Sequence, residues 1–218
     1  MRTVKLISMS QPIESNLETA EDLISYCARV SNPSNQNNVE TSEKLIGYLL
    51  KHKHFSPFEM VNVCLEITTT RDIARQILRH RSFSFQEFSQ RYADPTKELE
   101  FCIRECRLQD ERNRQNSIAT YDVDLVKYWE HMQIRAIQES EKMYKTAIEI
   151  GIAKEVARCV LPEGNTVSRL YINGTVRSFI HFIEVRSANG TQKEHMMVAR
   201  ECAKVISQIF PYISNKEQ

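Results

Sequence analysis

The chain has 218 residues, of which 41% are hydrophobic and 26% are charged, with 29 basic against 28 acidic side chains. This composition is that of a globular protein rather than a disordered one, and no apolar run approaches the roughly 18 residues of a membrane-spanning helix. The five glycines stand apart from one another, so neither of the usual glycine-rich phosphate-binding loops can be written. The N-terminal apolar stretch is too short for a signal peptide, and we expect a cytoplasmic location.

The first third of the chain predicts two strands with two helices between them. Residues 3–8 indicate an edge strand, and residues 61–68 alternate apolar and polar side chains, as a half-buried strand does. Residues 31–38 are rich in Asn and predict a loop. A capping-box pattern at Thr19–Asp22 precedes the first helix, whose apolar positions we take to be Leu23, Tyr26, Cys27 and Val30. A second helix starts near Ser42, with an apolar face made of Leu45, Tyr48 and Leu49.

Residues 71–79 predict a helix with two different faces. At about 100° per residue, its aliphatic side chains fall on one arc and its polar side chains on the other. The polar arc carries Arg71, Asp72, Arg75, Gln76 and Arg79. Like charges at this spacing repel each other, so the arginine row indicates either an anion-binding face or a solvated basic face.

The second half of the chain is predicted to be mainly helical. A helix from Asp122 to Ile150, ended by Gly151, carries an apolar stripe that predicts packing within the chain or against another subunit. The stripe consists of Leu125, Trp129, Met132, Ala136, Ser140, Met143, Ala147 and Ile150. A short helix ends before Pro162, a strand covers 166–172, and helices cover 175–187 and 191–209. Residues 108–120 are polar and basic and predict no clear element. The fold class is α+β: one domain over residues 1–218, with a twisted sheet packed by several helices, one of them long.

Metal binding has little support in the sequence. Of six cysteines only Cys102 and Cys106 are close together, and no further pair completes a four-ligand zinc site. His52 and His54 are close as well, but without neighbouring ligands they indicate surface histidines at a helix end. We therefore predict no metal and six reduced thiols.

The segment from Arg79 to Tyr92 combines arginines, hydroxyls, carboxamides and aromatic rings in a stretch expected to be irregular. Guanidinium groups suit phosphates through paired hydrogen bonds, and aromatic rings suit a planar heterocycle. The segment therefore favours a nucleotide or dinucleotide site over a solvated surface.

The same segment resembles the flavin-dependent thymidylate synthases, the ThyX family. Arg79-His80-Arg81, followed after seven residues by Ser89, matches that family's R-H-R-x7-S signature, and Ser89-x-Arg91-Tyr92 continues it. Further matches occur in family order at residues 54–59 and 155–162, and at Arg177 with Arg186 nine residues later. The resemblance covers about residues 20–190.

The resemblance implies an activity and its partners. Members methylate dUMP reductively to dTMP, with 5,10-methylenetetrahydrofolate as carbon donor, FAD as hydride carrier and NADPH as reductant. They form homotetramers with active sites built between subunits. By this similarity, neither nucleic acid nor a membrane is a partner.

The resemblance also implies site residues. The FAD set is Ser56, Arg79, His80, Arg81, Glu87, Thr175, Arg177 and His181. The dUMP set is Gln76, Arg79, Glu87, Phe88, Ser89, Gln90, Arg91, Arg158 and Arg186. Arg186 and Ser89 are the implied catalytic residues, with Arg186 favouring the N3-ionised form of the uracil ring.

The role of Ser89 has two readings. It lies where a nucleophile has been considered in this family, but no His or Lys is placed by the sequence to act as its base. We favour a hydrogen bond from Ser89 that positions dUMP. No cysteine falls in the motif, which argues against the cysteine route of the ordinary thymidylate synthases.

The sequence departs from the common family pattern near the flavin. Thr175 and His181 stand where many relatives have asparagine, and Phe85-Gln86 replaces a frequent Tyr-Asn. His181 is either a titrating group beside the flavin or a core histidine among Phe179, Phe182 and Ile183.

Three other functions remain open at this point. The arginine row, with Arg104, Arg107, Arg112 and Arg114, could form a groove for single-stranded nucleic acid, although the net charge is only +1. A helical assembly protein without chemistry would explain the long stripe but not the Arg79–Tyr92 segment. A flavin-dependent NADPH oxidase would not depend on dUMP.

Overall fold

A four-stranded antiparallel sheet organises the chain in the computed structural model, which describes residues 3–214. Its strand order is β1 (Thr3–Met9), β2 (Asn62–Thr70), β6 (Val167–Thr175) and β3 (Ser84–Glu87). β2 and β6 pair along their whole lengths, from Asn62 opposite Thr175 to Thr70 opposite Val167. The α+β class and the edge position of the first strand are confirmed. The expectation of an irregular segment after Arg81 is wrong in part, because residues 84–87 pair with β6.

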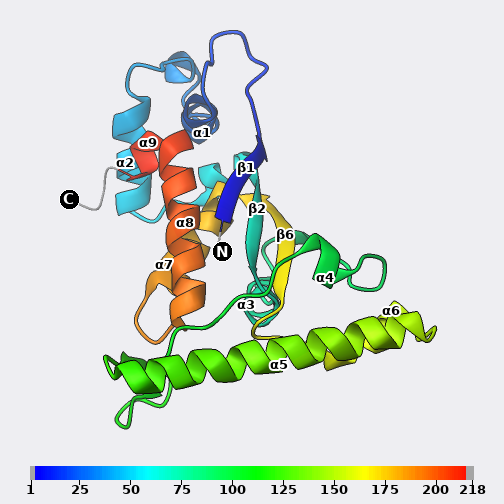
Figure 1. Ribbon diagram of the computed structural model, residues 1–218. Coiled ribbons are helices and arrows are strands. Elements are labelled where there is room, and N and C mark those ends of the chain that lie inside the picture. Colours follow the sequence, from blue (N-terminus) through cyan, green and yellow to red (C-terminus); the bar gives the residue numbers. More distant parts are fainter. Residues whose placement is uncertain (1–2, 215–218) are drawn as a thin grey trace.

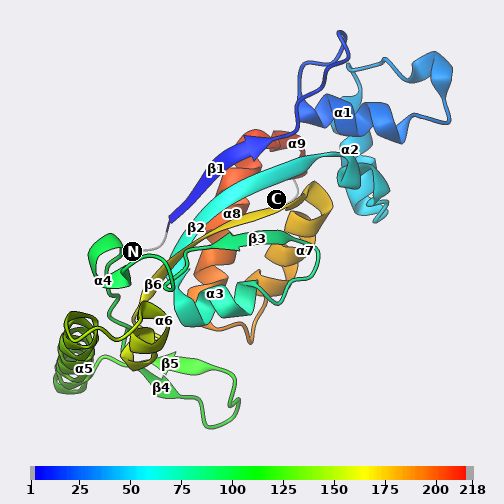
Figure 2. The ribbon, with the colours of Figure 1, turned by 90° about the vertical axis from the view of Figure 1, so that its right-hand side faces the viewer.

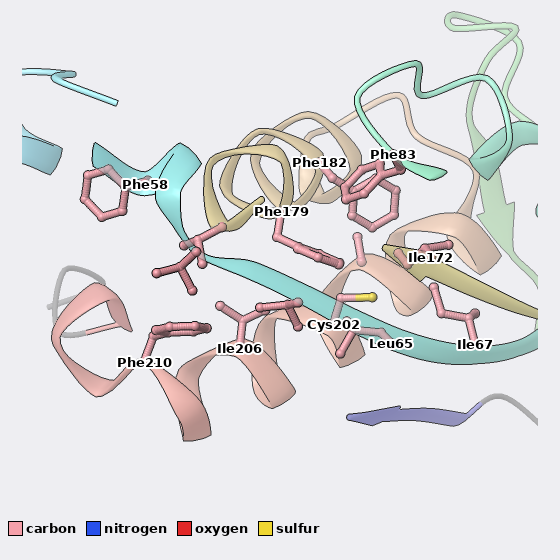
Figure 3. Packing of buried hydrophobic residues seen from close by; sticks show 14 of the residues in the cluster. Phe58, Leu65, Ile67, Phe83, Ile172, Phe179, Phe182, Cys202, Ile206 and Phe210 are labelled. Carbon is pink, nitrogen blue, oxygen red and sulfur yellow. The ribbon is translucent and has the colours of Figure 1, made fainter. Parts of the chain in front are cut away.

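Helices cover one face of this sheet. α8 (Lys193–Ile209) packs on β1 and β2, while α3 (Arg71–Ile77) and α7 (Val176–Ser187) pack on β6 (Figures 1 and 2). Val63, Leu65 and Ile67 point into that layer and are fully buried. The core there is rich in phenylalanine, with Phe179 and Phe182 of α7 above the strands (Figure 3). The opposite sheet face is polar, as the alternation in residues 61–68 predicts.

The first two helices cap one end of the sheet. α1 (Ala20–Ala28) begins with the predicted capping box, in which Thr19 Oγ1 accepts from the Asp22 N–H at 3.0 Å. η1 (Pro33–Asn35), α2 (Ser42–Lys51) and η2 (Ser56–Met60) follow, and the short α9 (Pro211–Ser214) packs on α2 and α8.

Two predicted core positions in this part are wrong. Val30 is exposed because it lies beyond the end of α1, whose C-cap residue is Arg29. Tyr48 is also exposed, with its ring centroid 4.3 Å from that of His52, while Ile46 fills the core. His52 and His54 are surface residues, as predicted.

The long helix α5 (Val123–Glu149) lies across the end of the sheet opposite α1 and α2 (Figures 1 and 2). It is reached through α4 (Pro95–Glu98) and a hairpin of β4 (Arg107–Gln109) and β5 (Ser117–Ala119), and α6 (Lys154–Ala157) and η3 (Arg158–Val160) follow it. Gly151 ends the helix region with a φ of 90°, a conformation that suits glycine. No helix among the described residues is long and apolar enough to cross a membrane.

Most of the apolar stripe of α5 does not pack within this chain. Trp129, Met132, Met143 and Ile150 are exposed, whereas the side chains that α5 buries are Gln133, Ile137 and Tyr144. The first of the two options, packing within the chain, is therefore wrong for most of the stripe, and only Leu125, Ser140 and Ala147 are half-buried. The helix turns a different, partly polar face inward because Gln133 bonds to the backbone at Arg104.

Candidate active site

α3 brings the Arg79–Tyr92 segment to the sheet. Its aliphatic residues Ile73, Ala74 and Ile77 are fully buried, as predicted, so its polar side chains face outward. The predicted helix is too long by two residues: it ends at Ile77, and Arg79 lies exposed in the turn that follows. Arg75 pairs with Glu163. The arginines therefore do not form one continuous row.

Arg186 and His80 meet between α7 and the end of α3. The Arg186 Nε donates to His80 Nε2 at 2.8 Å, so that ring nitrogen carries no proton. Burial, with the charge of Arg186 and then His181, lowers the pKa of His80 to about 4. Arg186 has a neutral partner, and no carboxylate among the described residues lies within ion-pair distance of it. Its positive charge is thus available to an anionic ligand.

A second histidine, which sequence reasoning missed, lies beside this pair. His195 on α8 is fully buried, and its Nδ1 lies 3.1 Å from Gln76 Oε1. Burial and then the charge of Arg186 lower its pKa to about 3. The position of His195 on an amphipathic helix gives no sequence signal beyond a core residue.

Three residues of the predicted FAD set share one pocket at the start of α7. Thr175, Arg177 and His181 line a cavity of about 550 Å³ together with Glu59 from η2. Glu59 holds this wall, because it pairs with Arg177 and accepts from Thr175 Oγ1 at 3.3 Å. His181 is exposed in the pocket, so its reading as a core histidine is wrong.

Phe83 packs closely against Gly174, the neighbour of the pocket residue Thr175. A Cβ at Gly174 would overlap the ring of Phe83, and Ser178 Oγ donates to the Ser82 carbonyl at 3.2 Å. Two further residues of the predicted FAD set, Ser56 at the start of η2 and Arg81 beside Ser82, are exposed. No side-chain hydrogen bond or ion pair holds Arg81 among the described residues.

Most of the predicted dUMP set lies at the other end of β6. Glu87 accepts from Ser168 Oγ at 2.7 Å, and Phe88 N–H donates to the Arg169 carbonyl at 2.8 Å. Arg91 pairs with Glu155 at 3.3 Å. Ser89 Oγ is 3.4 Å from the Arg91 nitrogen, and Gln90 is buried with its Nε2 unpartnered.

Arg71 is a second residue that the predicted set lacks. Its side chain is only 12% exposed, and its nearest carboxylate contact is Glu87 Oε1 at 4.0 Å. Burial lowers the pKa of Arg71, Glu87 opposes this, and Arg75 and Arg158 lower it further. Two weakly neutralised guanidinium groups, Arg71 and Arg158, therefore lie near each other, which is an environment that attracts an anion.

The two groups of predicted residues are separated along β6. Glu87 and Phe88 lie beside Leu170 and Arg169, whereas Thr175 and Arg177 stand at the strand's far end. Six residues of extended strand span roughly 20 Å. Within one chain, the FAD pocket and the Ser89–Arg91 segment therefore do not meet.

The structure weakens the nucleic-acid alternative. Arg104 and Arg107, two of its proposed contacts, have side chains only 13% and 14% exposed. Both pair with the buried Glu194, at 3.1 and 2.8 Å. They are used to anchor the β4–β5 hairpin to α8 and are not available to a phosphate backbone.

Comparison with solved structures gives the class to which this fold and site belong. The UMP/dUMP methylase PolB of Streptomyces cacaoi, bound with 5-Br dUMP, matches with a TM-score of 0.80 at 25% identity over 99% of this chain and 93% of that one. The same methylase bound with 5-Br UMP matches with a TM-score of 0.79. The fold is thus that of enzymes that methylate pyrimidine nucleotides.

Sequence comparison narrows this class to one family. Residues 13–212 match the family described as thymidylate synthase complementing protein, Thy1. The probable flavin-dependent thymidylate synthase of Paramecium bursaria Chlorella virus 1 is 46% identical over 212 residues, 97% of either chain. The flavin-dependent thymidylate synthase of Synechocystis sp. is 46% identical over 214 residues, again 97% of either chain. The chain belongs to the family of flavin-dependent thymidylate synthases, and the prediction of that family is confirmed.

The contact between Arg186 and His80 generates a prediction about titration. Replacing Arg186 with Met should raise the pKa of His80 above about 4 but leave it below about 6.5, because the burial remains. Since a lowered histidine pKa costs stability as the pH falls from about 6.5 towards 4, the variant should also lose less stability over that window.

An NMR titration of the His80 ring measures this shift directly. Arg177→Met is the matched control: it removes the same charge from the same helix at a site paired with Glu59. An unchanged His80 pKa in Arg186→Met would contradict the electrostatic account of the pair.

Proposed function

We propose that this chain converts dUMP to dTMP by reductive methylation, with 5,10-methylenetetrahydrofolate as carbon donor, FAD as hydride carrier and NADPH as reductant. The contact of Arg186 Nε with His80 Nε2 at 2.8 Å supports this most directly. It joins a residue expected to contact the pyrimidine to one expected to contact the flavin. The reaction would transfer a hydride from the flavin ring to the pyrimidine ring. The residues that bind these two rings therefore have to be neighbours.

The residues present fit a flavin dinucleotide. The pocket at Thr175, Arg177 and His181 falls in the size range of ligand sites, and Arg79 and Arg81 offer exposed guanidinium groups for a diphosphate. When bound and reduced by NADPH, the flavin would supply the hydride. Ser56, His80 and Glu87 complete the set proposed to hold it, with His80 presenting a neutral ring.

The proposed dUMP site uses charge in two places. Arg158, helped by Arg71, attracts the phosphate, and Arg186 stabilises negative charge on the uracil ring because a neutral histidine leaves its own charge unmatched. Gln76, Arg79 and Glu87 are further members of the proposed dUMP set. The remaining members of the proposed set are Phe88, Ser89, Gln90 and Arg91.

Ser89 serves in this proposal as a hydrogen-bond donor to dUMP and not as a nucleophile. Its hydroxyl contact among the described residues is the Arg91 backbone N–H at 3.4 Å, and no base is seen to bond to it. Activation of serine needs a base within hydrogen-bond reach. Cys27, Cys64 and Cys202 are poor candidates for a nucleophile, since burial raises the pKa of their thiols.

We further propose that the active enzyme is a homotetramer whose sites combine residues of different subunits. The separation of roughly 20 Å along β6 keeps the FAD pocket from the Ser89–Arg91 segment within one chain. The exposed stripe of α5, with Trp129, Met132 and Met143, is an apolar surface of the kind that subunits bury. Both features are accounted for if subunits pack along α5.

Removing the Arg186 charge tests the proposed activity. In Arg186→Ala, we expect dTMP formation to fall by about 100-fold or more, because the group acts on charge that develops during the reaction. FAD binding and the fold should persist. Release of deuterium from C5-labelled dUMP, with dTMP quantified by chromatography, measures the loss.

Arg112→Ala is the control, since it removes an exposed arginine from the turn between β4 and β5. Near-normal turnover in Arg186→Ala would contradict the catalytic role of Arg186. Absence of dTMP formation by the unaltered protein with all substrates present would contradict the proposed function itself.

Mixing two inactive variants tests whether sites are shared. We expect Arg177→Ala to disable the FAD pocket and Arg158→Ala to disable the phosphate site. If a site draws these residues from different subunits, tetramers refolded from a mixture should regain measurable dTMP formation.

The control mixture pairs Arg158→Ala with Arg91→Ala, which belong to the same group and should not complement each other. A mixture of Arg177→Ala and Arg158→Ala that stays as inactive as its components would show that each site is built within a single subunit.

A further inference from the structure

A chain of hydrogen bonds behind the proposed dUMP site runs from α3 to the start of α8. Gln76 lies between His195 and Gln192, and Gln192 in turn bonds to Glu194. The Gln76 Nε2 donates to Gln192 Oε1 at 2.8 Å, and the Gln192 Nε2 donates to Glu194 Oε2 at 3.1 Å. At the other end, His195 Nδ1 lies 3.1 Å from Gln76 Oε1.

The carboxylate of Glu194 determines which groups donate and which accept in this row of hydrogen bonds. Burial raises the pKa of Glu194, but the hydrogen bond from Arg107 and the charge of Arg104 outweigh it and hold the pKa below its ordinary value. Glu194 is therefore ionised and can only accept hydrogen bonds. The amide nitrogen of Gln192 has to face it, which leaves Gln192 Oε1 to face Gln76.

The orientation of the Gln76 amide and the tautomer of His195 follow in the same way. Gln76 has to turn its nitrogen toward Gln192 Oε1, so its oxygen faces His195. A carbonyl oxygen accepts, and therefore His195 carries its proton on Nδ1 and donates. With Arg186 nearby the ring stays neutral, and its Nε2, buried and without a partner in the described residues, is the bare nitrogen.

We propose that His195 is a positioning residue that fixes the side-chain amide of Gln76 for dUMP. The inference rests on the proposed function, in which Gln76 contacts the nucleotide. With one Nε2 hydrogen bound to Gln192 and one Oε1 lone pair bound to His195, Gln76 retains one hydrogen and one lone pair in set directions. Without His195 the Gln76 amide would be held only by its hydrogen bond to Gln192, so it could rotate about that bond, and the nucleotide would have to order it on binding.

Two substitutions at position 195 separate positioning from packing. His195→Leu removes the donor while keeping an apolar side chain of similar reach, and we expect the KM for dUMP to rise roughly tenfold with kcat little changed. His195→Asn keeps an N–H near the place of Nδ1 and should restore KM to within about twofold. The dissociation constant for FAD should be unaltered in both.

Val198→Ala is the matched control, because Val198 is equally buried on the same helix but lies outside the hydrogen-bonded chain. It should lower the melting temperature and leave the KM for dUMP unchanged. A His195→Leu variant that behaves in the same way, or an Asn variant that fails to restore KM, would overturn the positioning role.

The unaltered protein provides a second test that needs neither a variant nor activity. Nitrogen-15 NMR of the histidine rings should show His195 with a protonated Nδ1 and a bare Nε2 at neutral pH. The opposite tautomer would overturn the inference even if every variant failed to fold. Absence of dTMP formation by the unaltered protein would instead overturn the proposed function and, with it, the role of Gln76, so the two failures are distinguishable.

Discussion

The pairing of Arg186 with a neutral His80 is the interaction around which the candidate site is arranged. It ties the end of α7 to the turn after α3, the segment that carries the Arg-His-Arg motif. A carboxylate in place of His80 would neutralise Arg186 and leave nothing for an anionic ligand. Because the ring is buried and beside a fixed cation, it stays uncharged and orients the guanidinium without matching its charge.

Charge is handled differently elsewhere in the protein. Arg104 and Arg107 are balanced against the buried Glu194, and Arg177 is balanced against Glu59. These pairs hold elements in place, the first the β4–β5 hairpin and the second the wall of the pocket at α7. Arg71, Arg158 and Arg186 are less neutralised, and the proposal gives each of them an anionic group of dUMP as a partner.

Local patterns predicted much of the fold. The capping box at Thr19, the alternation of β2 and the glycine after α5 each depend on neighbouring residues alone, and each is confirmed. Val30 and Tyr48 were misplaced because helical spacing defines an apolar arc but not where the helix stops or which part of the arc meets the sheet. The strand at Ser84–Glu87 was missed because its pairing with β6 is a contact between distant segments. In the site, motif residues were found by resemblance, whereas Arg71 and His195 act through neighbours that only the tertiary structure brings near.

The central claim is that flavin and pyrimidine bind at adjoining positions on either side of the His80–Arg186 contact. Anaerobic reduction of the FAD-loaded protein by NADPH, followed by absorbance with and without dUMP, tests it most directly. The account predicts bound flavin that bleaches faster when dUMP is present, since the two ligands share one site. Bleaching at the same rate without dUMP would fit a simple NADPH oxidase, and failure to bind FAD would contradict the account altogether.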